Sequence, residues 1–233
     1  MVAESRSETA TREPDIRQRI LNEAINIFAS KGGELTTIRE ITEATRVNIA
    51  AVNYYFGSKD GLLKAVLNTV LDPLNAMRLR LLDTVEEKYR HEAPPAAAVL
   101  DALLRPLVQT ARAPDGGRIA VRLLQHLRAA PRESVTALVS DKFDHVAERF
   151  FAAFERAAPQ LTRAEIIWRY EFARGAAMHV LADSDPQSGR LAILSRGLCN
   201  SDDDDEVLAN LLRFVEAGFN APPLGLGAGN DGK

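Results

Sequence analysis

TTIREITEATRVNIAAVNYYFGSK, the stretch from Thr36 to Lys59, predicts two short helices joined by a tight turn. Thr37 and Glu40 are spaced to form a capping box, in which each side chain satisfies an unpaired backbone N–H of the other residue. Asn48 is suited to cap the second helix. Because the second helix of a helix-turn-helix can lie in the major groove of DNA, the stretch indicates a nucleic-acid-binding element.

The outer face of the second predicted helix carries side chains that suit a DNA groove. Small residues let the backbone approach base edges, asparagine can pair with adenine, and apolar groups can contact the thymine methyl. Val52 and Phe56 are spaced to point inward, which leaves outside Ile49, Ala50, Ala51, Asn53 and Tyr54. An ordinary helical hairpin with surface aromatic residues would show the same local pattern, so the flanking sequence has to decide between the two interpretations.

Two further predicted helices flank this stretch. Upstream, apolar residues at helical spacing precede Gly32-Gly33, which stops the helix, and downstream Ser58 caps a helix that begins at Lys59. The order Phe-Ala-x-x-Gly, Thr-Thr-Ile-x-x-Ile, then Val-Asn-x-x-x-Val-x-Tyr-Tyr-Phe-Gly-Ser-Lys strongly resembles the N-terminal domain of the TetR/AcrR family of transcriptional repressors. The resemblance covers about residues 14–70.

This resemblance implies a helix-turn-helix from Thr37 to Phe56 and a recognition helix from about Asn48 to Tyr54. It also implies phosphate contacts at Thr37, Tyr54, Tyr55 and Lys59. The expected DNA-binding residues are therefore Thr37, Asn48, Ile49, Ala50, Ala51, Asn53, Tyr54, Tyr55 and Lys59.

Two positions depart from the family pattern. Arg46 stands where the family usually has glycine, in a turn that requires a positive φ, and a residue with a side chain there costs roughly 1 kcal/mol. Asn53 stands where the family often has an aromatic residue. We therefore expect a mildly strained turn before the recognition helix.

Composition favours an all-α protein, because the chain is rich in Ala, Leu and Arg and lacks hairpin-turn signals. The formal net charge of −3 and the sequence pI near 5.9 are not those of a bulk nucleic-acid binder. Within residues 1–64, nine Lys and Arg face nine Asp and Glu. DNA affinity would therefore have to come from a local basic surface and from doubling of the site in a dimer.

The expected organisation is a disordered arm (1–13), a DNA-binding domain (14–60), a helical effector and dimerisation domain (61–220) and a disordered tail (221–233). One cysteine, no secretory signal and no long apolar run lead us to expect a cytoplasmic protein without a membrane span. No nucleophile, metal-ligand or dinucleotide motif is present, so we expect no catalytic residue, metal or cofactor.

The second domain is expected to hold an effector pocket and a dimer interface. By family resemblance, a cavity lies between the central helices, and its candidate residues are Met77, Leu81, Arg105, Val108, Leu124, Phe143, Phe150 and His179. The last two long helices have apolar faces that in TetR-like proteins pair with a twofold mate. The candidate interface residues are Ile166, Tyr170, Ala173, Ala177, Leu208, Leu211, Leu212 and Val215. Plain core packing explains either set equally well.

The segments Leu71–Asn75 and Asp115–Arg118 also resemble a subgroup of that family that responds to fatty acids or acyl-CoA. The sequence thus predicts a ligand-responsive repressor that binds a palindromic operator as a homodimer, with an apolar or amphipathic effector such as an acyl chain. Two alternatives stay open. One is a helical small-molecule-binding protein without productive DNA binding, and the other is an enzyme of unrecognised type.

Overall fold

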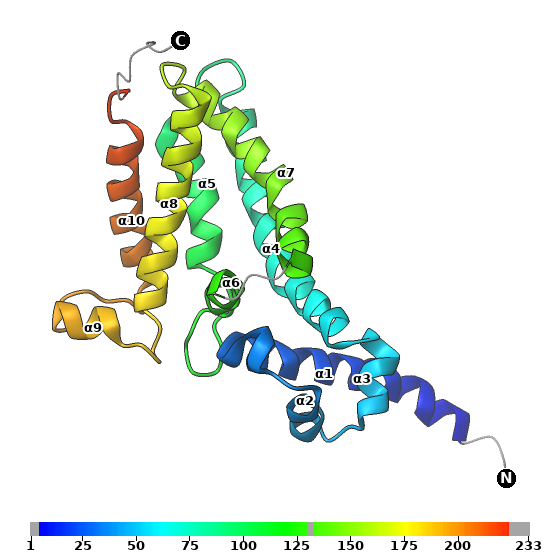
Figure 1. Cartoon of the computed structure of the whole chain (residues 1–233). Coiled ribbons are helices and arrows are strands. Elements are labelled where there is room, and N and C mark those ends of the chain that lie inside the picture. The colour runs from blue at the N-terminus through cyan, green and yellow to red at the C-terminus, as the bar shows by residue number, and fades with distance from the viewer. Residues whose placement is uncertain (1–4, 130–132, 224–233) are drawn as a thin grey trace, which may run out of the picture.

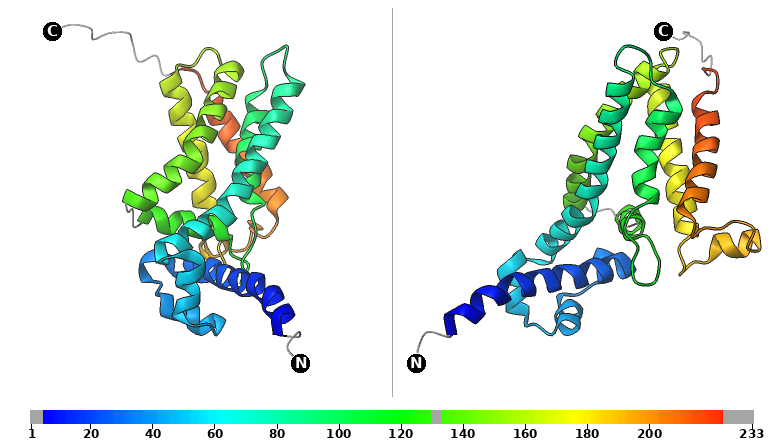
Figure 2. Two further views of the ribbon diagram at one scale, coloured as in Figure 1. Left: turned by 90° about the vertical axis from the view of Figure 1, so that its right-hand side faces the viewer. Right: turned by 180° about the vertical axis from the view of Figure 1, so that it is seen from behind.

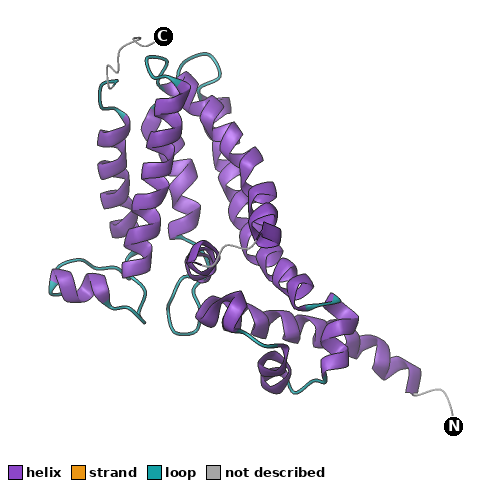
Figure 3. Cartoon of the chain, viewed as in Figure 1, coloured by secondary structure: helices purple, strands orange, loops and turns teal. Residues whose placement is uncertain are grey.

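The computed structural model describes residues 5–129 and 133–223, and every named element within these ranges is a helix (Figures 1 and 3). An isolated bridge joins Arg112 and Arg118. The all-α prediction is confirmed. The helices are α1 (Ser5–Leu35), α2 (Ile38–Thr45), α3 (Ile49–Phe56), α4 (Lys59–Lys88), α5 (Ala96–Val108), α6 (Ile119–Ala129), α7 (Glu133–Ala157), α8 (Arg163–Asp183), α9 (Arg190–Ser195) and α10 (Asp204–Phe219).

The first three helices enclose a small core, and the expected caps define their ends. Thr37 and Glu40 form the predicted capping box, in which the Thr37 backbone N–H donates to Glu40 Oε2 at 2.9 Å. Asn48 and Ser58 cap α3 and α4 through their side chains. The buried side chains that hold this unit together, all at 0 % exposure, are Ile20, Ala24, Phe28, Ile41 and Val52.

Helix α1 is interrupted near its C-terminal end. Gly32 has φ 76 and ψ 165, a conformation that is essentially restricted to glycine, so the helix stop expected at Gly32-Gly33 is present. At its other end, α1 begins at Ser5, inside the segment expected to be a disordered arm. Residues 5–13 include Ala, Arg and Glu, which favour helix. Residues 1–4 and 224–233 of the two expected disordered ends lie outside the described residues.

Helix α4 belongs to both parts of the molecule. It contains 30 residues, with Pro73 inside, and rises from α3 into the body, where α7 lies alongside it (Figure 1). Its buried residues Leu62 and Leu67 lie at the end that packs with the first three helices, and Leu82 lies within the body. Helices α8 and α10 lie side by side at the opposite edge of the body (Figures 1 and 2).

Helix α6 lies between the body and α1. His126 of α6 has its Nε2 atom 3.2 Å from the Ala29 carbonyl oxygen. Arg122 donates to both carboxylate oxygens of Asp185, through Nε at 2.5 Å and Nη2 at 2.6 Å, and Arg118 donates to Asp204. The helix is therefore tied to the end of α8 and to the start of α10.

Several boundaries differ slightly from those predicted. Helix α5 ends at Val108 instead of Arg112, because Arg112 pairs with Arg118 across a turn. The segment 186–198 contains the short helix α9, and Thr162 with Glu165 forms the expected capping box at the start of α8. Among the described helices, none combines the length and apolar character needed to cross a membrane.

We predict that Gly32→Ala lowers the free energy of unfolding by about 1–3 kcal/mol, because the side chain would be forced into a region restricted to glycine. The new Cβ would also lie 3.0 Å from Cγ and Nδ1 of His126. Chemical denaturation measures the loss. The control is Gly33→Ala, where φ is not in the positive range and the added Cβ would approach Leu63 Cδ2 at 3.2 Å. Equal effects of the two substitutions would contradict the assignment of strain to Gly32.

Candidate nucleic-acid interface

The turn before α3 has the strained conformation expected from the sequence. Arg46 lies in the left-handed region with φ 55 and ψ 40, and its backbone N–H donates to the Glu43 carbonyl at 3.3 Å. Its side chain is exposed and makes no hydrogen bond or ion pair with the residues that the structure describes. The sequence identified Arg46 only as a turn residue. The structure adds that its unpaired guanidinium lies beside α3, where it was not expected as a DNA contact.

Helix α3 presents a largely uncovered face. Val52 is fully buried, and the Asn48 side chain accepts a hydrogen bond from the Ala51 backbone N–H at 2.8 Å. Ile49 is 52 % exposed and Tyr54 is 75 % exposed. Of the residues expected to face DNA, Ala51 and Tyr55 are half-buried, and the exposed ones on this helix and its cap are Asn48, Ile49, Ala50, Asn53 and Tyr54.

The expected phosphate-contact residues lie at helix ends. Tyr54 and Tyr55 lie in the last turn of α3, with ring centroids 4.9 Å apart, and Lys59 begins α4 only three residues after Phe56. Lys59 Nζ lies 3.4 Å from the Glu34 carbonyl oxygen, three residues before the Thr37 cap. The α1–α2 junction, the end of α3 and the start of α4 therefore converge, with backbone N–H groups of two helix N-termini available to an anion.

Charges near this face are partly neutralised within the protein. Lys31 pairs with Glu40, and Arg39 pairs with Glu43 at 2.7 Å. The hydrogen bond from Lys31, together with that from the Thr37 backbone N–H, lowers the pKa of Glu40. Arg46 and Lys59, by contrast, have no carboxylate partner in the described parts of the chain. The near-zero net charge of the domain thus coexists with two unneutralised cations that flank α3.

The residues expected to line an effector pocket do not form one surface. Val108 and Phe150 are completely buried, so they are core residues. Arg105 pairs with Asp101 one turn earlier on α5, at 2.7 Å. The side chain of His179 is 78 % exposed and lies 3.8 Å from Asp183, away from the central helices. The half-buried members of the set, which pack around the core, are Met77, Leu81, Leu124 and Phe143.

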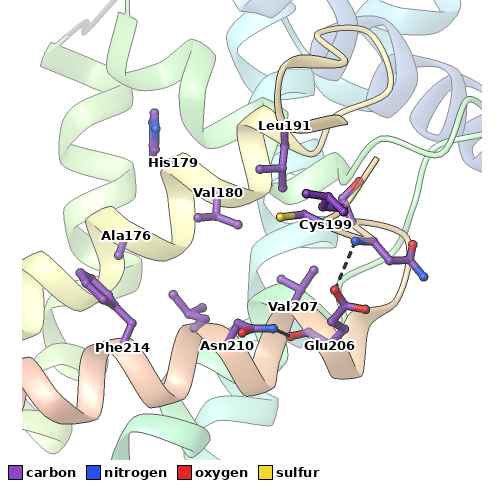
Figure 4. Close-up of a pocket in the computed structure, with 13 residues that line it drawn as sticks. Ala176, His179, Val180, Leu191, Cys199, Glu206, Val207, Asn210 and Phe214 are labelled. Atoms are coloured by element: carbon purple, nitrogen blue, oxygen red, sulfur yellow. Dashed lines mark hydrogen bonds between the residues drawn. The ribbon is translucent and has the colours of Figure 1, made fainter. Parts of the chain in front are cut away.

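His179 instead lines a cavity of about 570 Å³ between α8 and α10 (Figure 4). Ala176 and Val180 contribute from α8, and Val207 and Phe214 from α10. At its end, Glu206 accepts a hydrogen bond from the Asn200 backbone N–H at 3.2 Å. A second cavity of about 400 Å³ adjoins it, lined by Phe172, Phe214 and Gly218 among others.

The residues expected at a dimer interface mostly face the core of the protomer. All except the half-buried Leu212 are buried within the protomer, at 0–6 % exposure: Ile166, Tyr170, Ala173, Ala177, Leu208, Leu211 and Val215. The apolar faces of α8 and α10 are wider than one protomer can cover. Trp168, Phe172 and Phe214 remain 63 %, 65 % and 72 % exposed, and the Trp168 and Phe172 rings stack at 5.6 Å. These three side chains form an exposed aromatic face on α8 and α10.

Comparison with known families matches both parts of this architecture. Residues 20–66 match the model of bacterial regulatory proteins of the tetR family. Residues 101–218, half of the chain, match the model of the tetracyclin repressor-like C-terminal domain.

The relatives that match are transcriptional regulators. The HTH-type transcriptional repressor Rv3405c of Mycobacterium tuberculosis is 35 % identical over 106 residues, which are 42 % of this chain and 54 % of the relative. The HTH-type transcriptional dual regulator CecR of Shigella flexneri is 30 % identical over 89 residues, 38 % of this chain and 40 % of that protein. The chain therefore spans about half the length, or less, of these curated relatives.

Solved structures share the fold. The crystal structure of the probable transcriptional regulatory protein RHA5900 superposes with a TM-score of 0.56 at 20 % identity, covering 88 % of this chain and 100 % of that one. At this identity the likeness shows a common fold. With the helix-turn-helix in place at Thr37 to Phe56 and the C-terminal model covering half of its residues, the chain belongs to the TetR family of bacterial transcriptional regulators.

Proposed function

We propose that this protein is a ligand-responsive, sequence-specific DNA-binding repressor that acts as a homodimer on a palindromic operator. The observation that carries the proposal is the uncovered face of α3, flanked by Arg46 and Lys59, neither of which has a carboxylate partner among the described residues. Two relatives are a transcriptional repressor and a transcriptional dual regulator, which supports control of transcription. Residues 14–60 then form the DNA-binding domain, and residues 61–220 form the effector and dimerisation domain.

Base readout and backbone positioning belong to different residues of this surface. Asn53 and Ile49 are exposed on α3, and Ala50 and Ala51 are small enough for the helix to lie close to the base edges. Thr37, Tyr54, Tyr55 and Lys59 lie at helix ends, where hydroxyl, ammonium and backbone N–H groups can bind phosphates. Arg46 joins this second group.

The homodimer forms, in this proposal, through the aromatic face of Trp168, Phe172 and Phe214. Large exposed apolar patches on a soluble domain mark interaction sites. The cavities beside Phe214 provide recesses for the aromatic side chains of a second copy. A twofold axis through α8 and α10 would place one α3 on each side, so half-sites about one helical turn apart or a little more are expected.

The effector is an apolar or amphipathic small molecule, with an acyl chain as the first candidate by resemblance. It would bind among the central helices of the body, where Met77, Leu81, Leu124 and Phe143 are half-buried. Helices α4 and α6 connect this region to the DNA-binding unit, since α4 continues into it and His126 of α6 contacts Ala29. To release DNA, the effector must bind the DNA-incompetent conformation more tightly than the competent one.

We predict that two substitutions on the DNA-binding surface have different consequences. Lys59→Ala should weaken binding to all duplexes about equally and reduce the slope of log K against log salt by roughly one, because one phosphate contact is lost. Asn53→Ala should alter the preferred sequence, because a base contact is lost. The measurement is selection of an operator from random duplexes, followed by titration at several salt concentrations.

Lys88→Ala is the control, since this lysine lies at the far end of α4 and should leave DNA binding unchanged. A changed base preference with an unchanged salt slope in Lys59→Ala would contradict the assigned roles. If the selection enriched no symmetric sequence, the repressor proposal would be wrong. An intact dimer that binds no duplex would favour the alternative of a small-molecule-binding protein without productive DNA binding.

We predict that Trp168→Glu combined with Phe172→Glu converts the dimer to a monomer, because two carboxylates would have to be buried in an apolar interface. Light scattering at micromolar concentration measures the mass. The control is Leu35→Glu, at a leucine that is 76 % exposed but lies at the DNA-binding end. A monomeric parent protein, or a double variant that stays dimeric, would exclude this face as the interface.

A further inference from the structure

Arg78 is a buried cation at the centre of the body. It lies in the middle of α4 and is 4 % exposed. Its Nε–H donates to the Leu103 carbonyl of α5 at 2.9 Å, and Nη1 makes a long hydrogen bond of 3.4 Å to Asn75 Oδ1. Nη2 has no partner among the described residues. Nη2 is still partly accessible to solvent. Among the described side chains, the atom that is both fully enclosed and without a hydrogen bond is Asn68 Oδ1, not Arg78 Nη2.

No carboxylate of the described residues forms an ion pair with Arg78. Burial lowers its pKa to about 10, so the guanidinium is still charged at neutral pH. The titratable groups that face it from α8 are the neutral phenol of Tyr170 and the cation Arg174, and Arg174 already pairs with Glu171. The buried arginines Arg118 and Arg122 differ from Arg78, because each of them forms an ion pair with an aspartate. An uncompensated buried charge is unfavourable for the folded state.

The surrounding backbone explains the orientation of the side chain. Pro106 lies inside α5 and cannot donate a backbone hydrogen bond, so the carbonyl of Ala102, four residues earlier, lacks its usual helical partner and α5 is irregular beside Leu103. The Nε–H of Arg78 bonds within that turn, at Leu103. Asn75, one turn earlier on α4, donates to the Lys142 carbonyl of α7 at 3.0 Å. Arg78 is thereby fixed where α4, α5, α7 and α8 meet, with its two terminal nitrogens pointing away from the anchored Nε.

Apolar side chains surround this point. Leu74 and Leu82 lie one turn before and after Arg78 on α4, and both are buried. Phe151 packs edge-on against Tyr170, with ring centroids 5.0 Å apart. A ligand at this position would meet one positive charge in an otherwise hydrophobic environment. That combination favours a molecule with one anionic group on an apolar body.

We propose that the effector is an organic carboxylate, and that its carboxylate binds Nη1 and Nη2 of Arg78. A carboxylate can accept two parallel N–H bonds from one edge of a guanidinium, and the Nη1–Nη2 edge is the one left open once Nε is bound to Leu103. The apolar body of the molecule lies among the helices of the body. This inference rests on the proposed function for the existence of an effector, but it adds the chemical group that the site recognises.

The test compares carboxylates with uncharged amides of the same shape, by calorimetric titration of the full chain without DNA. The probe pairs are octanoate with octanamide, dodecanoate with dodecanamide, and benzoate with benzamide. The wild-type protein should bind at least one carboxylate about tenfold or more tightly than its amide. Arg78→Met should abolish this preference and leave amide binding unchanged, and Arg78→Lys should retain part of it. Arg80→Met is the matched control, because Arg80 is exposed on the same helix.

A purely structural role for Arg78 makes a different prediction. In that case Arg78→Met would lower thermal stability without changing the ratio of carboxylate to amide affinity. That result overturns the proposal, and so does a wild-type protein that prefers no carboxylate in any pair. If Arg78→Met does not fold, the partial preference of Arg78→Lys decides. Because the titration contains no DNA, failure of operator binding would refute the proposed function and leave this inference standing.

Discussion

The continuity of α4 is the constraint on which the other features depend. The helix runs without a break from the Ser58 cap to Lys88, with one backbone hydrogen bond missing at Pro73, and its buried side chains contribute to the core at both ends. A rotation or tilt of its upper part cannot be absorbed in a linker, since none separates the two units. α6 provides a second connection, because it touches α1 through His126 while Arg118 and Arg122 tie it to α10 and the end of α8. Helix α4 thus links the N-terminal unit directly to the body, and α6 holds the two parts together at a second point.

The sequence predicted local features well and long-range ones poorly. The caps at Thr37, Asn48 and Ser58 and the positive φ of Arg46 depend on residues a few positions apart, and all are present. The faces of α8 and α10 could not be assigned, because apolar residues cover more than one side of each helix. Tyr170 is buried while Phe172, on the opposite side of α8, is exposed; periodicity separates these two apolar sides but does not say which one packs inside the protomer. The burial of Arg78 could not be predicted either, because the sequence alone does not show which side of a helix an arginine faces or whether it has an acidic partner.

The net charge of the chain says less about its binding surfaces than the pairing of individual charged side chains does. The acidic groups near α3 are committed to specific cations, as with Glu40 to Lys31 and Glu43 to Arg39. Arg46 and Lys59 remain free to meet an anion. The same logic holds inside the body, where Arg118 and Arg122 have aspartate partners and Arg78 has none. In the two proposals made above, DNA phosphates and an effector carboxylate supply the negative charge that these basic residues lack within the protein.

The chain contains a single tryptophan, Trp168, whose exposed ring stacks on Phe172. Intrinsic indole emission therefore comes from one place only, the aromatic face of α8. In the proposed dimer, the wavelength and quenching of this emission would report self-association, because α3 and the surroundings of Arg78 contain no second indole. Tryptophan emission is therefore an intrinsic probe of the proposed assembly. DNA binding at α3 and ligand binding near Arg78 can be followed separately from it.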